Sequence, residues 1–201
     1  MLNSYRQYGA ALMSRLAAGC LLLASAYAWP LNLQDVLDNT AVTPPARVGF
    51  REERHNRMLK EPIVLTGYLE YVSPGHLRKV IETPEAESFL IADGQIEIVQ
   101  DGKTRRLSLG KSKPLQAMLG GIEAILAGHT EQLNESFDAE LSGASDDWSL
   151  QLKPKSRRIS AHLTGMQVKG DSNAVNSIRI DMKDGEWSLM EIQHAAAVPP
   201  E

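Results

Sequence analysis

The residue types that most often carry out catalysis occur in this sequence, but their spacing matches no catalytic motif. The histidines have no partner at metalloprotease spacing, and no Gly-x-Ser-x-Gly nucleophile elbow is present. We therefore expect no catalytic residue, no metal ligand and no cofactor, and we interpret the histidines as exposed loop residues. A Ser-His-Asp set that assembles only on folding stays open, because such triads are defined by their geometry in space. The histidines are His55, His76, His129, His162 and His194.

Paired acids and paired glycines are the remaining candidates for chemistry. We interpret Asp146-Asp147 and Glu52-Glu53 as solvated surface rather than as paired acid catalysts. Gly120-Gly121 lacks the Lys-Ser/Thr that follows the glycines of a phosphate-binding loop. Two glycines inside an apolar helical stripe cost roughly 1 kcal/mol each relative to alanine. They indicate either a pliable lid or close approach to a ligand, or else a plain break between two short helices, and the sequence does not decide between these interpretations.

The N-terminal 28 residues indicate export. Arg6 and Arg15 precede an apolar run, residues 16–28, that ends in Ala26-Tyr27-Ala28. A basic start, a short apolar segment and a small-x-small ending are the three parts of a secretory signal peptide. The run is 13 residues long, whereas a membrane-spanning helix needs about 20. We predict that residues 1–28 are a signal peptide cleaved after Ala28, which places the protein in the periplasm.

Cys20, the only cysteine, supports an alternative in which a bacterial lipid is attached to it. That alternative is weaker, because only four residues separate Arg15 from Cys20 and the apolar core continues beyond it. Removal of residues 1–28 leaves 173 residues with a formal charge of −6 and no cysteine. Such a chain can form one domain with a sizeable core. It has no disulfide, and its mild acidity makes it a poor candidate for binding nucleic acid.

Alternating apolar residues predict antiparallel hairpins over most of the chain. Three Asp-Gly pairs, at 93–94, 101–102 and 184–185, are strong hairpin signals. Hairpins with one apolar and one polar face predict a curved sheet whose inner face covers something. Strands are expected from residue 48 onward and at residues 63–71, 77–81, 88–92, 96–98, 107–109, 137–141, 148–154, 159–163, 175–180 and 187–192.

Two segments have helical spacing instead. Residues 31–37 predict a short amphipathic helix that ends before Pro44-Pro45. A second helix is predicted from Pro114 to Gly128, with an apolar stripe near period 3.6. A sheet this long must curl to bury its apolar face. We expect an α+β fold over residues 29–194, a half-open barrel covered by a helical lid, with residues 195–201 as a flexible tail.

The cavity inside such a barrel would suit an acyl chain. A filled core is the alternative for the same apolar strand faces. The residues predicted to line the cavity are Leu69, Tyr71, Leu77, Ile81, Leu90, Ile96, Ile98, Leu150, Leu152, Ile178 and Ile180. The residues predicted to form the lid are Leu115, Met118, Leu119, Ile122 and Leu126.

The segment LTGYLEYVSPGHLRKVIETPEAESFLIADGQIEIVQDGK resembles LolA, a family of periplasmic outer-membrane lipoprotein carriers. The likeness is carried by Gly67, Leu69, Pro74, Pro84, Glu87-Ser88-Phe89-Leu90 and Asp93-Gly94, and downstream by Trp148 to Lys155. It implies a half-open barrel covered by helices, with an apolar cavity for the acyl chains of lipoproteins. The chain departs from the family at Ser73, where carriers have an arginine that helps to hold the lid. Leu77 and Lys79 stand at positions that are aromatic in the carriers.

Two functions from different classes follow. The first is a monomeric carrier for lipoproteins or other acylated lipids, which takes its cargo from an inner-membrane donor toward an outer-membrane acceptor. The second is an enzyme, or an accessory subunit of one, that hydrolyses or transfers acyl groups in lipid or polyene biosynthesis. The lack of a partnered nucleophile favours the carrier.

Overall fold

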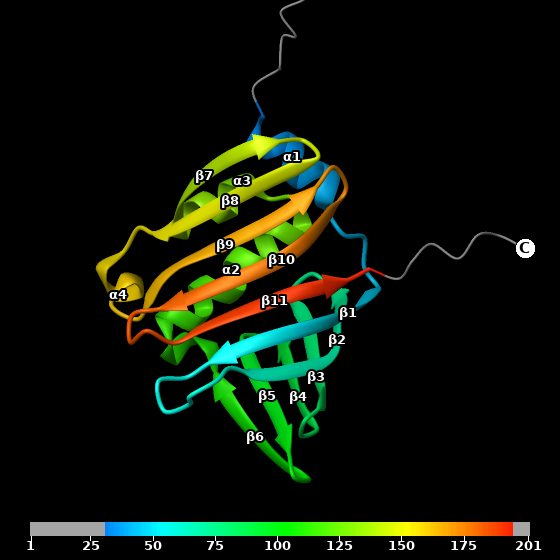
Figure 1. The fold of residues 1–201 in the computed structure, drawn as a ribbon, viewed down its shortest axis with the longest axis vertical. Coiled ribbons are helices and arrows are strands. Elements are labelled where there is room, and N and C mark those ends of the chain that lie inside the picture. Colours follow the sequence, from blue (N-terminus) through cyan, green and yellow to red (C-terminus); the bar gives the residue numbers. More distant parts are fainter. Residues whose placement is uncertain (1–30, 195–201) are drawn as a thin grey trace, which may run out of the picture. The chain divides into compact units, whose positions relative to one another are not determined.

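An antiparallel sheet of eleven strands dominates residues 31–194, the part of the chain that the computed structural model describes. Its spatial order is β6-β5-β4-β3-β2-β1-β11-β10-β9-β8-β7, and the sheet curves without joining its two edge strands, β6 and β7 (Figure 1). This confirms the predicted half-open barrel. The strands are β1 (Ala46–His55), β2 (Ile63–Ser73), β3 (His76–Thr83), β4 (Glu87–Ala92), β5 (Gln95–Gln100), β6 (Lys103–Ser108), β7 (Phe137–Ala144), β8 (Asp147–Pro154), β9 (Leu163–Asp171), β10 (Ala174–Met182) and β11 (Trp187–Gln193).

The predicted signal peptide, its cleavage after Ala28 and the tail at 195–201 lie outside the described residues. Within residues 31–194, none of the helices combines the length and the apolarity needed to cross a bilayer.

Tight hairpins connect successive strands where Asp-Gly pairs predicted them. Asp93 and Asp101 have positive φ angles of 50° and 51°, and the glycines that follow them have φ angles of 71° and 68°. Two consecutive residues with positive φ suit the twist of a hairpin, and Asp and Gly tolerate that conformation best. These turns fix the register of β4, β5 and β6 and therefore decide which side chains point into the barrel.

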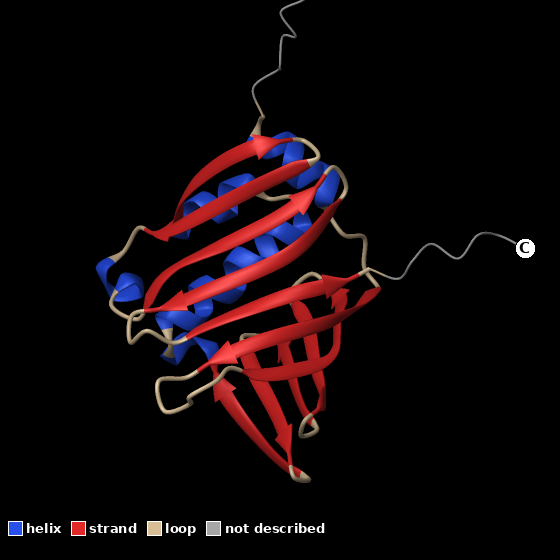
Figure 2. Ribbon diagram, in the orientation of Figure 1, coloured by secondary structure: helices blue, strands red, loops and turns tan. Residues whose placement is uncertain are grey.

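The helices pack on one side of the sheet, against the half formed by β7 to β10 (Figure 2). The first helix begins where the side chain of Asn32 accepts a hydrogen bond from the backbone N–H of Gln34 at 3.1 Å. The second has Pro114 in its first turn and ends at Gly128, whose φ is 73°. The helices are α1 (Leu33–Thr40), α2 (Lys113–Ala127), α3 (Thr130–Ser136) and α4 (Arg157–Ser160), with a single 3-10 turn η1 (Leu109–Lys111).

The apolar core is divided unevenly between the two halves of the sheet. A large cluster joins β7–β10 to α1, α2 and α3, and its members include Trp148, Leu150 and Phe137, all at most 1% exposed. A smaller cluster of Phe50, Leu65 and Ile81 lies across β1, β2 and β3. Most of the buried apolar area therefore stabilises the half of the barrel that the helices cover.

Four segments differ from the sequence prediction. Residues 157–160 form α4 and not the start of a strand, because the side chain of Ser156 accepts a hydrogen bond from the N–H of Ile159 at 3.2 Å and begins a helical turn. Strand β9 continues well past the predicted limit, to Asp171. Leu109 belongs to η1 and not to the last strand of the meander. The helix α3 was not predicted, because Leu133 is its one buried apolar residue and gives no periodicity.

Candidate functional site

The strand register assigns the sheet residues to two faces, because directly paired residues in an antiparallel ladder point to the same side. Glu52 pairs with Met190, which is followed across the sheet by Ile178, Val168 and Leu150. Leu150 and Val168 belong to the cluster that contacts the helices, so this side is the inner one. We call it the concave face. On the other side of β1, the same face continues through Leu69, Lys79, Phe89 and Ile98.

The register brings all but one of the predicted cavity residues onto the concave face. Leu90 is the exception, because it pairs with Arg78 and Glu97 on the outer, charged face of the sheet. The alternation of β4 makes Phe89 and Ile91 the inward residues instead. A shift by one residue in the assumed alternation moves a side chain to the opposite face of the sheet. The residues on the concave face are Leu69, Tyr71, Leu77, Ile81, Ile96, Ile98, Leu150, Leu152, Ile178 and Ile180.

These residues fall into a filled part and an open part of the barrel. Leu150 and Leu152 are 0% exposed and lie in the large core cluster, so at these two positions the filled-core alternative holds. Ile178 and Ile180 are partly buried and pack against the same cluster. The concave face of β1–β6, which we call the open half, is different. Its buried residues are Phe50, Glu52, Leu65, Tyr71, Ile81 and Ile96, and its half-buried apolar ones include Leu69, Leu77, Phe89, Ile91 and Ile98.

Helix α2 lies across the concave side and carries the predicted lid stripe (Figure 1). Met118 and Ile122 pack against the large core cluster. Leu115, Leu119 and Leu126 are half-buried and lie outside both core clusters. The stripe is therefore anchored to the filled half along one edge. A role as a lid over a ligand remains a prediction.

The far side of α2 reaches toward the open half. The carboxylate of Glu123 lies 3.9 Å from the position that a Cβ on Gly75, in the β2–β3 turn, would take. Burial and this carboxylate together raise the pKa of the Tyr71 phenol. This turn also contains Ser73, the position at which the carriers have a lid-holding arginine. A carboxylate on α2 thus lies close to this turn.

The glycine pair Gly120-Gly121 does not break the helix, because α2 runs continuously from Lys113 to Ala127. The two glycines have different surroundings. A Cβ on Gly121 would lie 2.9 Å from Cε2 of Phe137, whereas a Cβ on Gly120 would have nothing within 4 Å. Gly121 therefore permits close approach of the helix to a core aromatic side chain. This removes the interpretation of the pair as a break between two helices.

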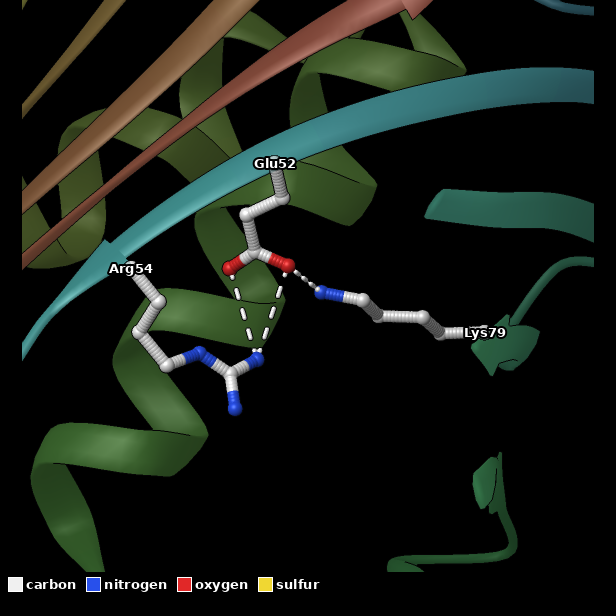
Figure 3. A network of polar contacts seen from close by, with 3 residues as sticks. All are labelled: Glu52, Arg54 and Lys79. Carbon is white, nitrogen blue, oxygen red and sulfur yellow. Dashed lines mark hydrogen bonds and ion pairs between the residues drawn. The ribbon is translucent and has the colours of Figure 1, made fainter. Parts of the chain in front are cut away.

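Glu52 is buried, at 3% exposure, and the expectation that Glu52-Glu53 is solvated surface is wrong for this residue. The alternation of β1 turns Glu52 to the concave face beside Phe50. Its carboxylate accepts a hydrogen bond from Nζ of Lys79, and Nη2 of Arg54 lies 3.4 Å from its Oε1 (Figure 3). Nζ of Lys79 is also 4.9 Å from the centre of the Phe50 ring. Sequence reasoning missed this cluster, although Lys79 on a predicted inward strand position was a signal for it.

Burial sets the electrostatics of this cluster. Loss of hydration lowers the pKa of Lys79, and the neighbouring Glu52 carboxylate offsets part of that effect. Arg54 is 43% exposed along its side chain, so its guanidinium remains partly hydrated. A buried ion pair costs desolvation energy that its Coulombic attraction only partly returns. The cluster therefore places a polar, hydrogen-bonded group among the apolar side chains of the concave face.

Among the described residues, no three His, Cys, Asp or Glu side chains are grouped closely enough to hold a metal ion. One Ser-His-Asp set does assemble on folding. Oγ of Ser73 lies 3.1 Å from Nδ1 of His76, and Nε2 of His76 lies 3.8 Å from Oδ1 of Asp93. The second distance is too long for a hydrogen bond. Asp93 is also 86% exposed along its side chain, so it does not orient the imidazole as a triad acid must.

The remaining histidines have separate surroundings. His55 stacks on Trp187 with ring centres 5.6 Å apart, and His194 Nε2 lies 2.9 Å from the carbonyl oxygen of Val175. His129 precedes α3 and is exposed, as is His162. Asp146, in the β7–β8 turn, and Asp147, at the start of β8, are both exposed, as expected.

The described residues thus form a curved, half-open antiparallel sheet with helices packed against the inner side of one half. A family model described as outer membrane lipoprotein carrier protein LolA-like matches residues 25–198. The chain belongs to this LolA-like family. A search among curated proteins gave no match.

Solved structures with low sequence identity resemble this fold. A LolA superfamily protein from Nitrosomonas europaea is 11% identical, with a TM-score of 0.44, over 84% of this chain and 96% of that one. The lipoprotein LppX from Mycobacterium tuberculosis is 9% identical, with a TM-score of 0.43, over 80% and 93%. The MucA/MucB complex structure from Pseudomonas aeruginosa includes a chain that is 14% identical, with a TM-score of 0.42, over 85% of this chain but 59% of that one. Likenesses of this size support no conclusion about function.

Proposed function

We propose that this protein is a non-catalytic carrier that binds the acyl chains of lipoproteins or other acylated lipids on the open half of its concave face. Membership of the LolA-like family supports a carrier role. The observation that carries the proposal is the patch of half-buried apolar side chains on β2–β5, beside α2 and facing the inside of the barrel. Apolar side chains gathered on a concave surface are typical of ligand-binding sites.

The physical role of the site would be to take methylenes out of water. Each buried methylene contributes about 0.8 kcal/mol. A single acyl chain with about ten covered methylenes would gain about 8 kcal/mol before the cost of association is subtracted. Reversible binding of this strength suits a carrier, because the cargo must also leave. In the predicted periplasmic setting, the carrier would receive cargo from an inner-membrane donor and deliver it to an outer-membrane acceptor.

The enzyme alternative can be tested in the same preparation. Protein purified from the periplasm is extracted with organic solvent, and the extract is analysed by mass spectrometry. A carrier yields an intact acylated lipid. In parallel, the protein and its Ser73→Ala variant are incubated with p-nitrophenyl acyl esters. The carrier proposal expects no turnover above that of buffer. Ester hydrolysis by the wild-type protein that disappears in Ser73→Ala would overturn it in favour of a hydrolase built on Ser73 and His76.

A further inference from the structure

A cavity of about 490 Å³ lies beside the beginning of α2, away from the Glu52 cluster. Its apolar wall combines two residues of the predicted lid, Leu115 and Met118, with Leu163 of β9 and Met182 of β10. Met118, Leu163 and Met182 also belong to or pack against the large core cluster. The cavity therefore lies where the lid helix meets the inner side of the sheet, with an apolar floor that continues into the lid stripe.

The titratable side chains that line this cavity are all basic. They are Lys111, Lys113, Arg158 and His162. The chain as a whole has a net charge of −4, so the basic lining of this cavity differs from the overall acidity of the chain. Within the described residues, neither lysine nor Arg158 forms an ion pair with a carboxylate, and Lys113 donates only to the amide oxygen of Gln116 at 3.0 Å.

Clustered cations without counter-charges raise the local electrostatic potential and attract anions. Most other cations on the sheet do have carboxylate partners, as Arg78 has in Glu70 and Arg106 in Glu97. A purely apolar ligand would gain nothing from this rim. An amphiphile with a negative head would place its head among the cations and its chain on Leu115 and Met118.

We propose that this cavity binds the phosphate-bearing head group of an anionic acyl lipid, with the adjoining methylenes on its apolar floor. Lysine and arginine together suit a phosphate, since arginine can bind two oxygens at once and lysine acts as a compact charge. The proposal rests on the proposed function for the acyl chain and adds the chemistry of the head. It selects phosphorylated lipids over neutral ones as cargo.

The test compares three probes on the periplasmic protein by isothermal titration calorimetry. Palmitoyl lysophosphatidic acid has both the chain and the phosphate, monopalmitoylglycerol has only the chain, and glycerol 3-phosphate has only the phosphate. The test variant combines Lys111→Gln, Lys113→Gln and Arg158→Gln. The matched control combines Lys60→Gln, Lys169→Gln and Arg57→Gln, which removes the same residue types and the same charge from exposed sites outside the cavity.

The proposal expects lysophosphatidic acid to bind the wild-type protein at least about tenfold more tightly than monopalmitoylglycerol, because hydrogen bonds to charged groups are the strong ones. The triple cavity variant should lose that advantage while its affinity for monopalmitoylglycerol and its melting temperature stay unchanged. The control variant should retain the advantage. Raising the salt concentration should weaken the binding of lysophosphatidic acid but not the binding of monopalmitoylglycerol.

Each other outcome rejects a distinct claim. Equal binding of the two lipids, unaffected by the cavity variant, would overturn the head-group proposal and leave the acyl carrier intact. Glycerol 3-phosphate could instead bind as tightly as lysophosphatidic acid and lose this binding in the cavity variant. The ligand of the cavity would then be a free phosphate compound and not a lipid head group. Failure of both lipids to bind would contradict the carrier function itself.

Discussion

Glu52 occupies a position at which the alternation of β1 requires an inward side chain, and it is a carboxylate in an apolar neighbourhood. Alternation alone could have predicted an inward position for Glu52. The neighbouring residues of β1 are mostly charged, however, so the segment resembles a strand on the protein surface. Burial of Glu52 depends on Lys79, which is 27 residues away in sequence. Pairing over such a distance becomes visible only once the register of β1, β2 and β3 is known.

The Glu52–Lys79 pair gives the first prediction. Lys79→Met removes the main partner of a carboxylate that is 3% exposed, so we expect the free energy of unfolding to fall by about 2–4 kcal/mol. The double change Glu52→Leu with Lys79→Met removes both charges and should recover most of that loss. Urea denaturation of the wild-type protein and both variants measures this. A double variant as unstable as the single one would show that the pair is not the cause.

The glycine pair gives a second prediction at the same scale. Gly120→Ala should raise the free energy of unfolding by up to about 1 kcal/mol, because alanine favours the helix and the added methyl group meets no atom within 4 Å. Gly121→Ala should lower it by about 1–3 kcal/mol, because its methyl group would be 2.9 Å from Phe137. Thermal and urea denaturation compare the two. Equal effects at both positions would contradict the packing of α2 described above.

At the scale of elements, segments with a clear apolar period were predictable and segments without one were not. The stripe in α2 and the Asp-Gly hairpins carried strong signals, and both are present. The helices α3 and α4 were missed because seven and four residues are too few to show a period. In α4 the deciding interaction is a single cap from Ser156, which also makes the segment before Leu163 helical and not extended.

The lid role of α2 is tested by two residues on the same helix. Leu119 is half-buried and lies outside both core clusters, whereas Ile125 is 3% exposed inside the large one. We expect Leu119→Glu to cost less than about 1 kcal/mol of stability but to weaken binding of a fluorescent fatty acid at least tenfold. Ile125→Glu should instead unfold the domain, with a loss above about 4 kcal/mol.

Thermal denaturation and probe titration of the two lid variants are read together. If Leu119→Glu and Ile125→Glu lose the same stability, Leu119 is a residue of the packed core and not part of a lid. Stable Leu119→Glu protein with unchanged probe affinity would show that the helix does not contact the ligand.

At the scale of the whole molecule, the sequence predicted the curvature of the sheet but not its division into two parts. Leu150 and Leu77 have the same alternation signal, yet Leu150 is fully buried in packed core and Leu77 is half-buried in the open half. The difference arises because the helices cover β7–β10, and a pattern within one strand cannot report what lies over it. The error at Leu90 had another cause, since a strand of six residues leaves little alternation to fix its face.

The central claim is that the open half of the concave face is the acyl-binding surface. Leu77 and Leu90 are half-buried leucines on adjacent strands, one on the concave face and one on the outer face, so they form a matched pair. Titration of a fluorescent fatty acid into Leu77→Glu and Leu90→Glu protein tests the claim directly. The carrier account predicts a loss of affinity of at least about tenfold for Leu77→Glu, because the charge must be desolvated beneath the chain. It predicts little change for Leu90→Glu. Equal losses, or unchanged binding in Leu77→Glu protein that remains folded, would contradict it.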